Sequence, residues 1–237
     1  MCGRYTLTNP DPARLRARFD ILESAAEAAD EPRFNIAPTD PVHAVRRFGE
    51  ARELGRLRWG LVPGLWAEQK GQRPLINARA ESVATQPAFA ESFRERRCLM
   101  PADGFYEWLT DERGKRPVWF SRPDGDLFAF AGIWAELERR GSDDVLHSCA
   151  LITCPPNELM RPVHDRMPVV LDPAAESAWL DPELAPEEAI SLLVPAPEGA
   201  LVAREVSDLV NDVRRDGPEL IEARAESTGA AGQTAIF

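Results

Sequence analysis

The chain has 237 residues, of which 44% are hydrophobic and 28% charged, and its formal net charge is −11 at pH 7. Such a length and composition are typical of one globular domain. They exclude a membrane-spanning protein, because no apolar run is long enough to cross a bilayer. The first residues also lack the apolar core of a signal peptide. We therefore expect a cytoplasmic protein that does not contact a membrane.

The negative charge is unevenly distributed. Residues 1–120 hold 19 Lys and Arg against 17 Asp and Glu, a balance of +2, and residues 121–237 hold 9 against 22, a balance of −13. The first part can therefore present a local basic face in spite of the overall charge. Arginine is much commoner than lysine, and its planar guanidinium suits phosphate recognition. The net charge thus does not exclude a nucleic-acid partner.

The predicted elements are mainly strands. Short apolar runs, rich in β-branched and aromatic residues and separated by Pro, Gly and Asp, recur along the chain. In chain order they are RYTL, FNIAP, VHAVRRF, LRWGLVP, LINARAE, CLMPADGFYEWL, PVWFS, LFAFAGIWAEL, SCALITC and MPVVLD. The absence of an alternating β-α-β pattern disfavours a doubly wound sheet and indicates an α+β fold dominated by antiparallel strands.

Helical signals are fewer. We expect one or two helices within residues 10–29, beginning with Asn9 as N-cap and Pro10 as the first helical residue. Further helices are expected at 86–96, 173–180 and 186–193. The small and polar residues 225–237 indicate a flexible tail that follows a single domain over residues 1–224.

Cys2 is the first candidate for chemistry. If the initiator Met is removed, Cys2 carries a free α-amine beside its thiol. With a reference pKa of about 7.7–8.0, a sizeable fraction of that amine is uncharged and nucleophilic near about pH 7.5. Such an aminothiol condenses with an aldehyde to an imine, which the thiolate then closes to a thiazolidine. We expect the amine and sulfur to be exposed. The alternatives are a buried, inert thiol and an N-terminal nucleophile that attacks a peptide bond.

The other cysteines give no sign of a disulfide or a metal site. Without a secretory signal, free thiols are expected, and we assign three of them to core packing: Cys98, Cys149 and Cys154. Three histidines occur: His43, His147 and His164. They do not combine with the cysteines in the spacing of zinc ligands, so we expect no metal and no cofactor.

Two titratable residues lie in apolar surroundings. Glu107 interrupts the run MPADGFYEWL, and burial there would raise its pKa and suit it to proton transfer near neutrality. His164, between a Pro-Val turn and a strand, suits general acid or base catalysis. Asp165 is expected to point away from it, because neighbouring strand residues face opposite sides. The alternatives are a water-facing glutamate and a structural histidine.

The segment PLINARAES alternates like a strand. Asn77, Arg79 and Glu81 share one face, and the small or apolar residues between them share the other. A strand face with Asn and Arg can hold a phosphodiester or a sugar, because arginine grips phosphate with two donors. The alternative is an ordinary solvated face of a sheet.

Taken together, these segments resemble the SOS-response-associated peptidase family. Each motif is weak alone, but eight in fixed order, beginning at residue 2 and spread over residues 2–211, are specific. They are MCGRY (1–5), RFNIAPT (33–39), RWGLVP (58–63), INARAES (76–82), RRCLMPADGFYEW (96–108), FAGIW (130–134), ITC (152–154) and HDRMPVVL (164–171), followed by a weaker VSDLVN (206–211). One departure is WGLVPGLWAEQK, in which Leu65 displaces Trp66 by one place from the family's tryptophan.

The resemblance implies a fold and a set of site residues. The fold would be coiled, mostly antiparallel β-sheet with a barrel-like core, flanking short helices and a central DNA groove. Cys2 would be the nucleophile, Asn77 would orient the aldehyde and the Cys2 amine, Glu107 would move protons, and His164 would assist sugar ring opening and crosslink reversal. The residues that match DNA-contacting or site-shaping positions are Arg4, Asn35, Pro38, Arg79, Trp108 and Arg166.

The function implied by the resemblance is covalent capture of abasic sites in single-stranded DNA. A thiazolidine crosslink through Cys2 would shield the lesion during the DNA damage response, accompanied by crosslink reversal, weak lyase activity and autocatalytic removal of Met1. We expect a monomer whose partner is single-stranded DNA containing abasic sites. Two alternatives remain: a cysteine-type peptidase and a non-covalent binder of modified DNA.

Overall fold

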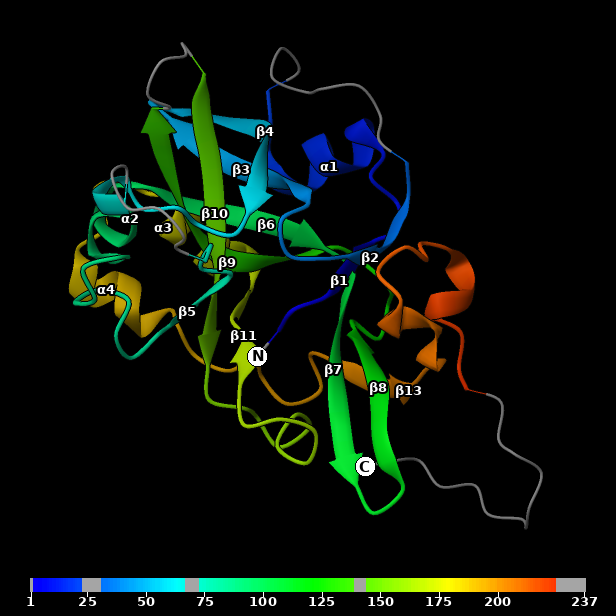
Figure 1. Cartoon of the computed structure of the whole chain (residues 1–237). Helices are drawn as coiled ribbons and strands as arrows, with labels where there is room; N and C mark the ends of the chain where they lie inside the picture. Colours follow the sequence, from blue (N-terminus) through cyan, green and yellow to red (C-terminus); the bar gives the residue numbers. More distant parts are fainter. Residues whose placement is uncertain (1, 23–30, 67–72, 139–143, 225–237) are drawn as a thin grey trace.

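The computed structural model describes residues 2–22, 31–66, 73–138 and 144–224. Its core is a closed barrel of five strands, seen at the centre of Figure 1. The strands run in the order β10-β4-β3-β6-β9, and pairing of β9 with β10 closes the ring. Only the β10–β4 pair is parallel among these neighbours. The barrel strands are β3 (Pro41–Phe48), β4 (Ala51–Trp59), β6 (Arg97–Ala102), β9 (Phe128–Glu138) and β10 (Val145–Cys154).

A second sheet of five antiparallel strands lies against the barrel. Its order is β13-β8-β7-β1-β2. The strands are β1 (Tyr5–Leu7), β2 (Arg33–Ile36), β7 (Gly104–Asp111), β8 (Gly114–Ser121) and β13 (Val202–Glu205). Three short strands extend the barrel sheet, with β5 (Asn77–Arg79) and β11 (Met167–Pro168) beside β10, and β12 (Val170–Leu171) beside β9.

The two sheets share one apolar core. All of β6 and the first eight residues of β9 are buried, because other elements exclude water from both of their faces. Tyr5 of β1 meets Trp59 and Phe130 edge-on, with ring centroids 5.3 Å and 5.7 Å apart. Phe105 of β7 also meets Phe130 edge-on, at 5.9 Å. Such pairs favour this geometry because the positive ring edge faces a negative ring face.

The predicted run CLMPADGFYEWL forms two strands instead of one. The chain leaves the barrel after β6 and enters the second sheet as β7, with Asp103 between them. The Asp103 carboxylate accepts hydrogen bonds from Thr6 Oγ1 at 2.6 Å and from the backbone N–H and hydroxyl of Thr8 at 2.6 Å and 2.7 Å. These bonds attach the turn between β6 and β7 to β1 and the residues that follow it. A segment distant in the sequence therefore determines where the run is divided into two strands.

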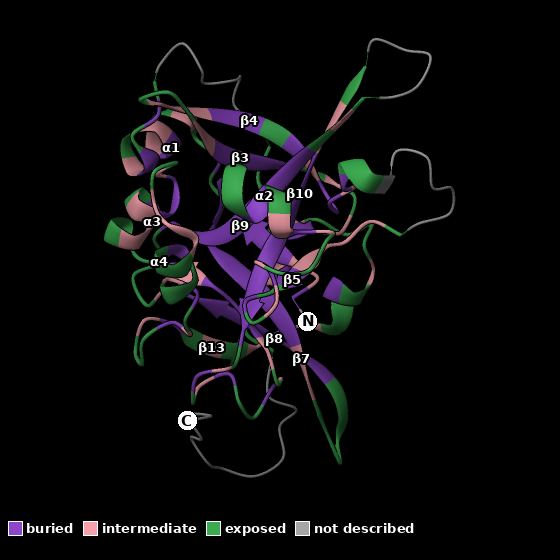
Figure 2. Ribbon diagram, turned by 90° about the vertical axis from the view of Figure 1, so that its left-hand side faces the viewer, coloured by how far each residue is buried: buried purple, intermediate pink, exposed green. Residues whose placement is uncertain are grey.

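Short helices flank the sheets, and Figure 2 shows α1, α3 and α4 along one side of the molecule. The described residues include the α-helices α1 (Pro12–Phe19), α2 (Ala90–Glu95), α3 (Pro173–Trp179) and α4 (Pro186–Ser191). They also include the 3-10 turns η2 (Gly64–Trp66), η3 (Asp208–Asn211) and η4 (Pro218–Leu220). The predicted fold class, mostly antiparallel β with a barrel-like core and short helices in a single domain, is confirmed.

The start predicted for the first helix is wrong by two residues. Asp11, not Asn9, is the N-cap, since its side chain accepts from the N–H of Ala13 at 2.9 Å and Pro12 is the first helical residue. The helix ends early because Asp20 adopts a left-handed conformation with φ of 54°. Residues 23–29 of the predicted span lie outside the described residues, as does the predicted tail 225–237. No helix in the described residues is long and apolar enough to cross a membrane.

Gly104 generates a test of how closely the second sheet is packed. A Cβ at this position would lie 2.4 Å from the Trp119 indole, which is held by a hydrogen bond from its Nε1 to Thr6 Oγ1 at 3.3 Å. Gly104→Ala should lower the free energy of unfolding by about 1–3 kcal/mol because the indole cannot move away without strain. Urea denaturation measures the difference. Gly64→Ala is the control, since a Cβ there meets nothing within 4 Å. Equal losses in the two variants would contradict the prediction.

Candidate functional site

The four residues predicted to be catalytic come from separate parts of the chain and meet where it begins. Cys2 precedes β1, Asn77 opens β5, Glu107 lies in β7 and His164 lies in the turn before β11. Figure 1 shows the N-terminal end of the chain next to β11. The Asn77 amide donates to the Cys2 carbonyl at 2.9 Å. The charge of Glu107 acts on both the Cys2 thiol and His164, so these groups are electrostatic neighbours.

Cys2 is fully buried, so the expectation of an exposed sulfur is wrong. Burial raises the pKa of the Cys2 thiol well above its usual value, and the negative charge of Glu107 raises it further. The thiol donates to the Arg4 carbonyl at 3.8 Å. The sulfur is therefore protonated in this state, and it becomes nucleophilic only if a neighbouring base removes its proton. Met1 lies outside the described residues, so its removal stays a prediction.

Glu107 is buried, with 2% of its surface exposed, and does not face water. Desolvation raises its pKa above the ordinary value, while the neighbouring His164 and the Trp108 N–H act in the opposite direction. The prediction of a buried glutamate with a raised pKa is confirmed. A carboxyl group that keeps its proton closer to neutrality can both give and take protons.

His164 lies in the turn before β11, and two neighbouring residues contact its Nδ1 atom. The Arg166 N–H donates to His164 Nδ1 at 3.0 Å, and Asp165 Oδ1 lies 2.9 Å from the same nitrogen. Nδ1 cannot accept from Arg166 and donate to Asp165 at once. The contact with Arg166 fits an Nδ1 atom without a proton, whereas the contact with Asp165 fits an Nδ1 atom that carries one. The expectation that Asp165 points away is wrong, because this segment is a turn and not a strand.

Asn77 lies on the expected face of its strand. Ala78 is fully buried and Arg79 is exposed, as the alternation predicts. The Asn77 Oδ1 atom is buried and accepts no hydrogen bond from the described residues. Because its amide nitrogen already binds the Cys2 carbonyl, this oxygen is an acceptor placed beside the start of the chain.

The predicted DNA contacts near β5 differ in availability. Arg79 is exposed, and its side chain makes no hydrogen bond or ion pair with another described residue, although its charge helps to lower the pKa of Glu81. Arg166 is mostly buried, with 12% of its side chain exposed, and both of its terminal nitrogens pair with the Glu81 carboxylate. Its Nη2 also donates to the Thr153 carbonyl. The positive charge of Arg166 is thus balanced within the protein, whereas that of Arg79 faces solvent.

The remaining predicted contacts lie around β2 and β7. Arg4 Nη1 donates to Asn35 Oδ1 at 2.9 Å, and the half-exposed Trp108 donates from Nε1 to Asn211 Oδ1 at 2.8 Å. Pro38 is half-buried in a turn. Asn35 is 1% exposed and its amide nitrogen is used by three backbone carbonyls. The Asn35 side chain therefore has a structural role and offers no surface for direct contact with DNA.

Two residues that contact predicted site residues were not among the candidates predicted from the sequence. Asn211 accepts from Trp108, and Asp216 accepts from the backbone of Asn35. The weak motif VSDLVN was the only signal for this region, and nothing local in it shows which strand the segment touches. The side chain of Trp66, whose displacement from the family pattern was noted, lies outside the described part of the structure.

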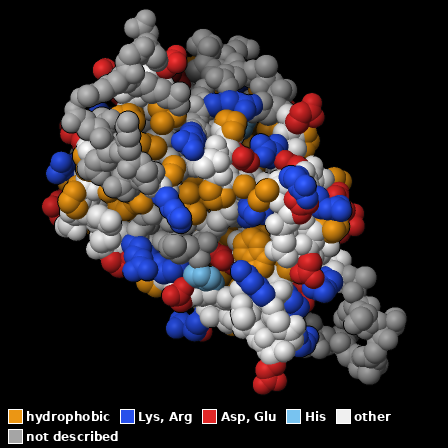
Figure 3. Space-filling model, in the orientation of Figure 1, with side chains coloured by type: hydrophobic (Ala, Val, Ile, Leu, Met, Phe, Trp, Pro, Cys, Tyr) orange, Lys and Arg blue, Asp and Glu red, His pale blue; other side chains and the backbone are white. Residues whose placement is uncertain are grey.

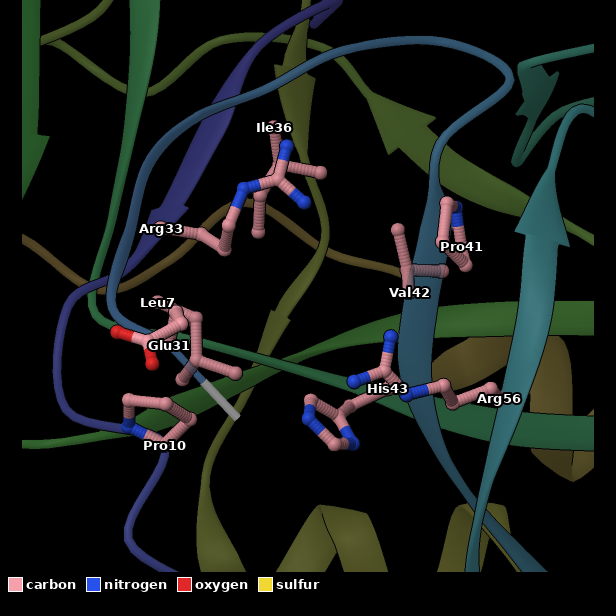
Figure 4. Close-up of a pocket in the computed structure, with 9 residues that line it drawn as sticks. All are labelled: Leu7, Pro10, Glu31, Arg33, Ile36, Pro41, Val42, His43 and Arg56. Carbon is pink, nitrogen blue, oxygen red and sulfur yellow. The ribbon is translucent and has the colours of Figure 1, made fainter. Parts of the chain in front are cut away.

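A separate hollow of about 240 Å³ lies between β2 and the β3–β4 pair (Figure 4). Arg33 lies on one side, and His43 and Arg56 lie side by side on the other. None of the predicted site residues lines it. Within the described ranges, no three His, Cys, Asp or Glu side chains gather closely enough to hold a metal ion.

Comparisons with known proteins show the family and the fold of the chain. The model of a family described as SOS response associated peptidase (SRAP) matches residues 1–213. The abasic site processing protein YoqW of Bacillus subtilis (strain 168) is 38% identical over 225 residues, which cover 94% of this chain and 100% of that protein. The abasic site processing protein YedK of Escherichia coli (strain K12) is 31% identical over 229 residues, covering 94% of this chain and 99% of that protein.

A crystal structure of a protein from Bacteroides thetaiotaomicron shares the fold. It matches with a TM-score of 0.81 over 94% of this chain and 100% of that protein, at 21% sequence identity. A crystal structure of a protein from Bordetella bronchiseptica matches with a TM-score of 0.73 over 87% of this chain and 100% of that protein, at 25% identity.

The raised pKa of Glu107 predicts a pH-dependent gain in stability for Glu107→Gln. The folded protein keeps a proton that the unfolded chain releases near the ordinary pKa of 4.5. Wild-type stability therefore falls as the pH rises from that value through the raised folded pKa. Glutamine does not ionise, so the variant should gain stability above this window, on the order of 1 kcal/mol for each tenfold difference in proton affinity. Urea unfolding between about pH 4 and pH 8 measures the gain. A difference that is constant with pH would contradict this explanation.

Proposed function

Because the chain belongs to the SOS response associated peptidase (SRAP) family, we propose that it captures abasic sites in single-stranded DNA by a covalent bond through Cys2. The observation that carries the proposal is the meeting of Asn77, Glu107 and His164 around a cysteine at the second position. The names of the relatives YoqW and YedK, both abasic site processing proteins, support the substrate.

The first step is formation of an imine. An abasic sugar in its open form presents an aldehyde, and the protonated ring of His164 can give a proton to the ring oxygen as the anomeric hydroxyl group loses its own proton to water. The α-amine of Cys2, freed from Met1, adds to the aldehyde carbon. Asn77 Oδ1 accepts from the amine and orients its lone pair. Glu107 then gives its proton to the hydroxyl group, which leaves as water.

The second step closes the ring. Glu107, now a carboxylate, takes the proton from the Cys2 thiol, and the sulfur adds to the imine carbon. The nitrogen of the imine, which is formed as an iminium ion when water leaves, keeps its one hydrogen and becomes neutral as the sulfur adds. The thiol proton restores the protonated Glu107, so the net reaction joins aldehyde and aminothiol with loss of one water. The buried setting favours both steps, because desolvation disfavours the charged ammonium and keeps the amine nucleophilic. The raised pKa of Glu107 lets one carboxyl group act first as acid and then as base.

Cys2→Ala tests this reaction directly. Wild-type protein incubated with an abasic oligonucleotide should give a heat-stable covalent band on a denaturing gel, and Cys2→Ala should give none. Cys154→Ala is the matched control, since Cys154 is also a free and buried cysteine but takes no part in the reaction. Intact mass of the wild type should show loss of Met1. An undiminished band with Cys2→Ala, or crosslinking by protein that retains Met1, would refute the proposal.

The same experiment separates the two alternatives. A general cysteine peptidase predicts cleavage of unrelated peptides, lost in Cys2→Ala, without a band on abasic DNA. A non-covalent binder of modified DNA predicts binding that survives Cys2→Ala and weakens steeply with salt, because phosphate contacts release counterions.

Arg79→Ala tests the predicted phosphate contact. Arg79 is exposed beside Asn77, so its loss should weaken binding of single-stranded DNA by up to about tenfold and reduce the slope of log Kd against log salt by about one. The rate of reaction with a small free aldehyde should stay unchanged, because that substrate has no phosphate. A loss of the same size with the free aldehyde would place Arg79 in the chemistry instead of in DNA binding.

A further inference from the structure

The segment from Ser207 to Ile221 covers the outer face of the second sheet. Val210 and Leu220 are fully buried in it and pack with Tyr106 and Trp119 in a small core separate from the main one. This apolar contact attaches the segment to β7 and β8. Apolar packing is non-directional, however, and does not by itself determine which backbone atoms of the segment meet β2.

Two polar side chains set that register from opposite sides. Asn35 of β2 donates from Nδ2 to the carbonyls of Val210, Asp212 and Arg215, at 3.3, 3.1 and 2.9 Å. In return, Asp216 accepts from the backbone N–H groups of Phe34 and Asn35 and from Arg33 Nε. We call this pair, Asn35 and Asp216, the clasp.

The clasped segment in turn holds two side chains of the site. Arg4 Nη1 donates to the Val210 carbonyl at 2.8 Å and to Asn35 Oδ1 at 2.9 Å. Trp108 Nε1 donates to Asn211 Oδ1 at 2.8 Å. Both residues adjoin the chemistry, because the Arg4 carbonyl accepts from the Cys2 thiol and Trp108 follows Glu107 in β7.

We propose that Asn35 and Asp216 are positioning residues that fix the 208–216 segment so that it holds Arg4 and Trp108 in place to bind single-stranded DNA beside Cys2. This inference rests on the proposed function and extends it to Asp216, which lies beyond the family match that ends at residue 213. Neither residue of the clasp touches the reacting atoms. Its loss should therefore weaken DNA binding and leave the reaction with a small aldehyde unchanged.

A charge-removing substitution separates the effect of the clasp from a simple electrostatic effect, because the two change DNA binding in opposite directions. Asp216→Asn removes a negative charge, which by electrostatics alone should tighten the binding of DNA. It also weakens the clasp, because the ion pair with Arg33 is lost. The matched control is Asp212→Asn, which removes the same charge from the same segment. The Asp212 carboxylate bonds only within the exposed local turn, to Arg214, among the described residues.

The Kd is measured for a single-stranded oligonucleotide with a tetrahydrofuran abasic analogue, which has no aldehyde and cannot crosslink. Asp216→Asn should raise the Kd about threefold to tenfold, and Asp212→Asn should leave it unchanged or lower it. In an Arg4→Ala background, Asp216→Asn should raise the Kd by a smaller factor than in the wild type, because only its effect through Trp108 is then left. Binding by Asp216→Asn that matches Asp212→Asn, or losses that add fully in the double variant, would overturn the proposal.

A second readout needs no DNA. Hydrogen exchange of the Trp108 indole N–H can be followed by NMR in the free protein. It should accelerate in Asp216→Asn, and also in Asn211→Ala, which removes only the acceptor of that N–H. It should not accelerate in Asp212→Asn. Unchanged exchange in Asp216→Asn would overturn the clasp even if its DNA binding falls. Conversely, if wild-type protein forms no crosslink yet Asp216→Asn shows both effects, the proposed covalent function fails and the clasp stands.

Discussion

The placement of the first residues of the chain inside the protein is the constraint on which the rest of the site depends. β1 lies between β7 and β2 in the second sheet, and Tyr5 is anchored in the shared core by Trp59 and Phe130. Chain termini are usually mobile unless a strand or helix ties them down. Here a three-residue strand does so, and it places Cys2 within reach of side chains from β5, β7 and the turn before β11.

The same burial sets the chemistry of the site. Removing Cys2 and Glu107 from water raises the pKa of both groups, so both keep their protons to a higher pH than they would in solution. The Cys2 thiol therefore needs a neighbouring base to become a thiolate. The Glu107 carboxyl group likewise needs a neighbouring acceptor for its proton. His164, whose Nδ1 atom accepts from the Arg166 N–H, is a further titratable group whose charge acts on Glu107.

The acidic second part of the chain contributes to the site through structure. Asp216, from this second part, pairs with Arg33 and accepts from two backbone N–H groups of β2. In the first part of the chain, Glu81 pairs with Arg166 in the same way. Acidic residues that are paired in this way repel a phosphate backbone far less than free carboxylates do. The net charge of −11 is therefore a poor guide to what this face of the protein attracts. Figure 3 accordingly shows Lys and Arg side chains spread between apolar ones over the face seen in Figure 1.

The sequence by itself determined most of the strands and the alternation of Asn77 and Arg79, because these follow from local patterns of polarity. It left the burial of Glu107 open, because the apolar run around it fits either orientation of its side chain. The ordered motifs indicated the family. Only the tertiary structure decided that the run around Asp103 divides, that the Cys2 thiol is buried and that Asn35 holds the segment near Asp216. The physical reason is distance along the chain: the bond from Thr6 to Asp103 spans 97 residues and that from Asn35 to Asp216 spans 181. No local pattern records a partner so far away.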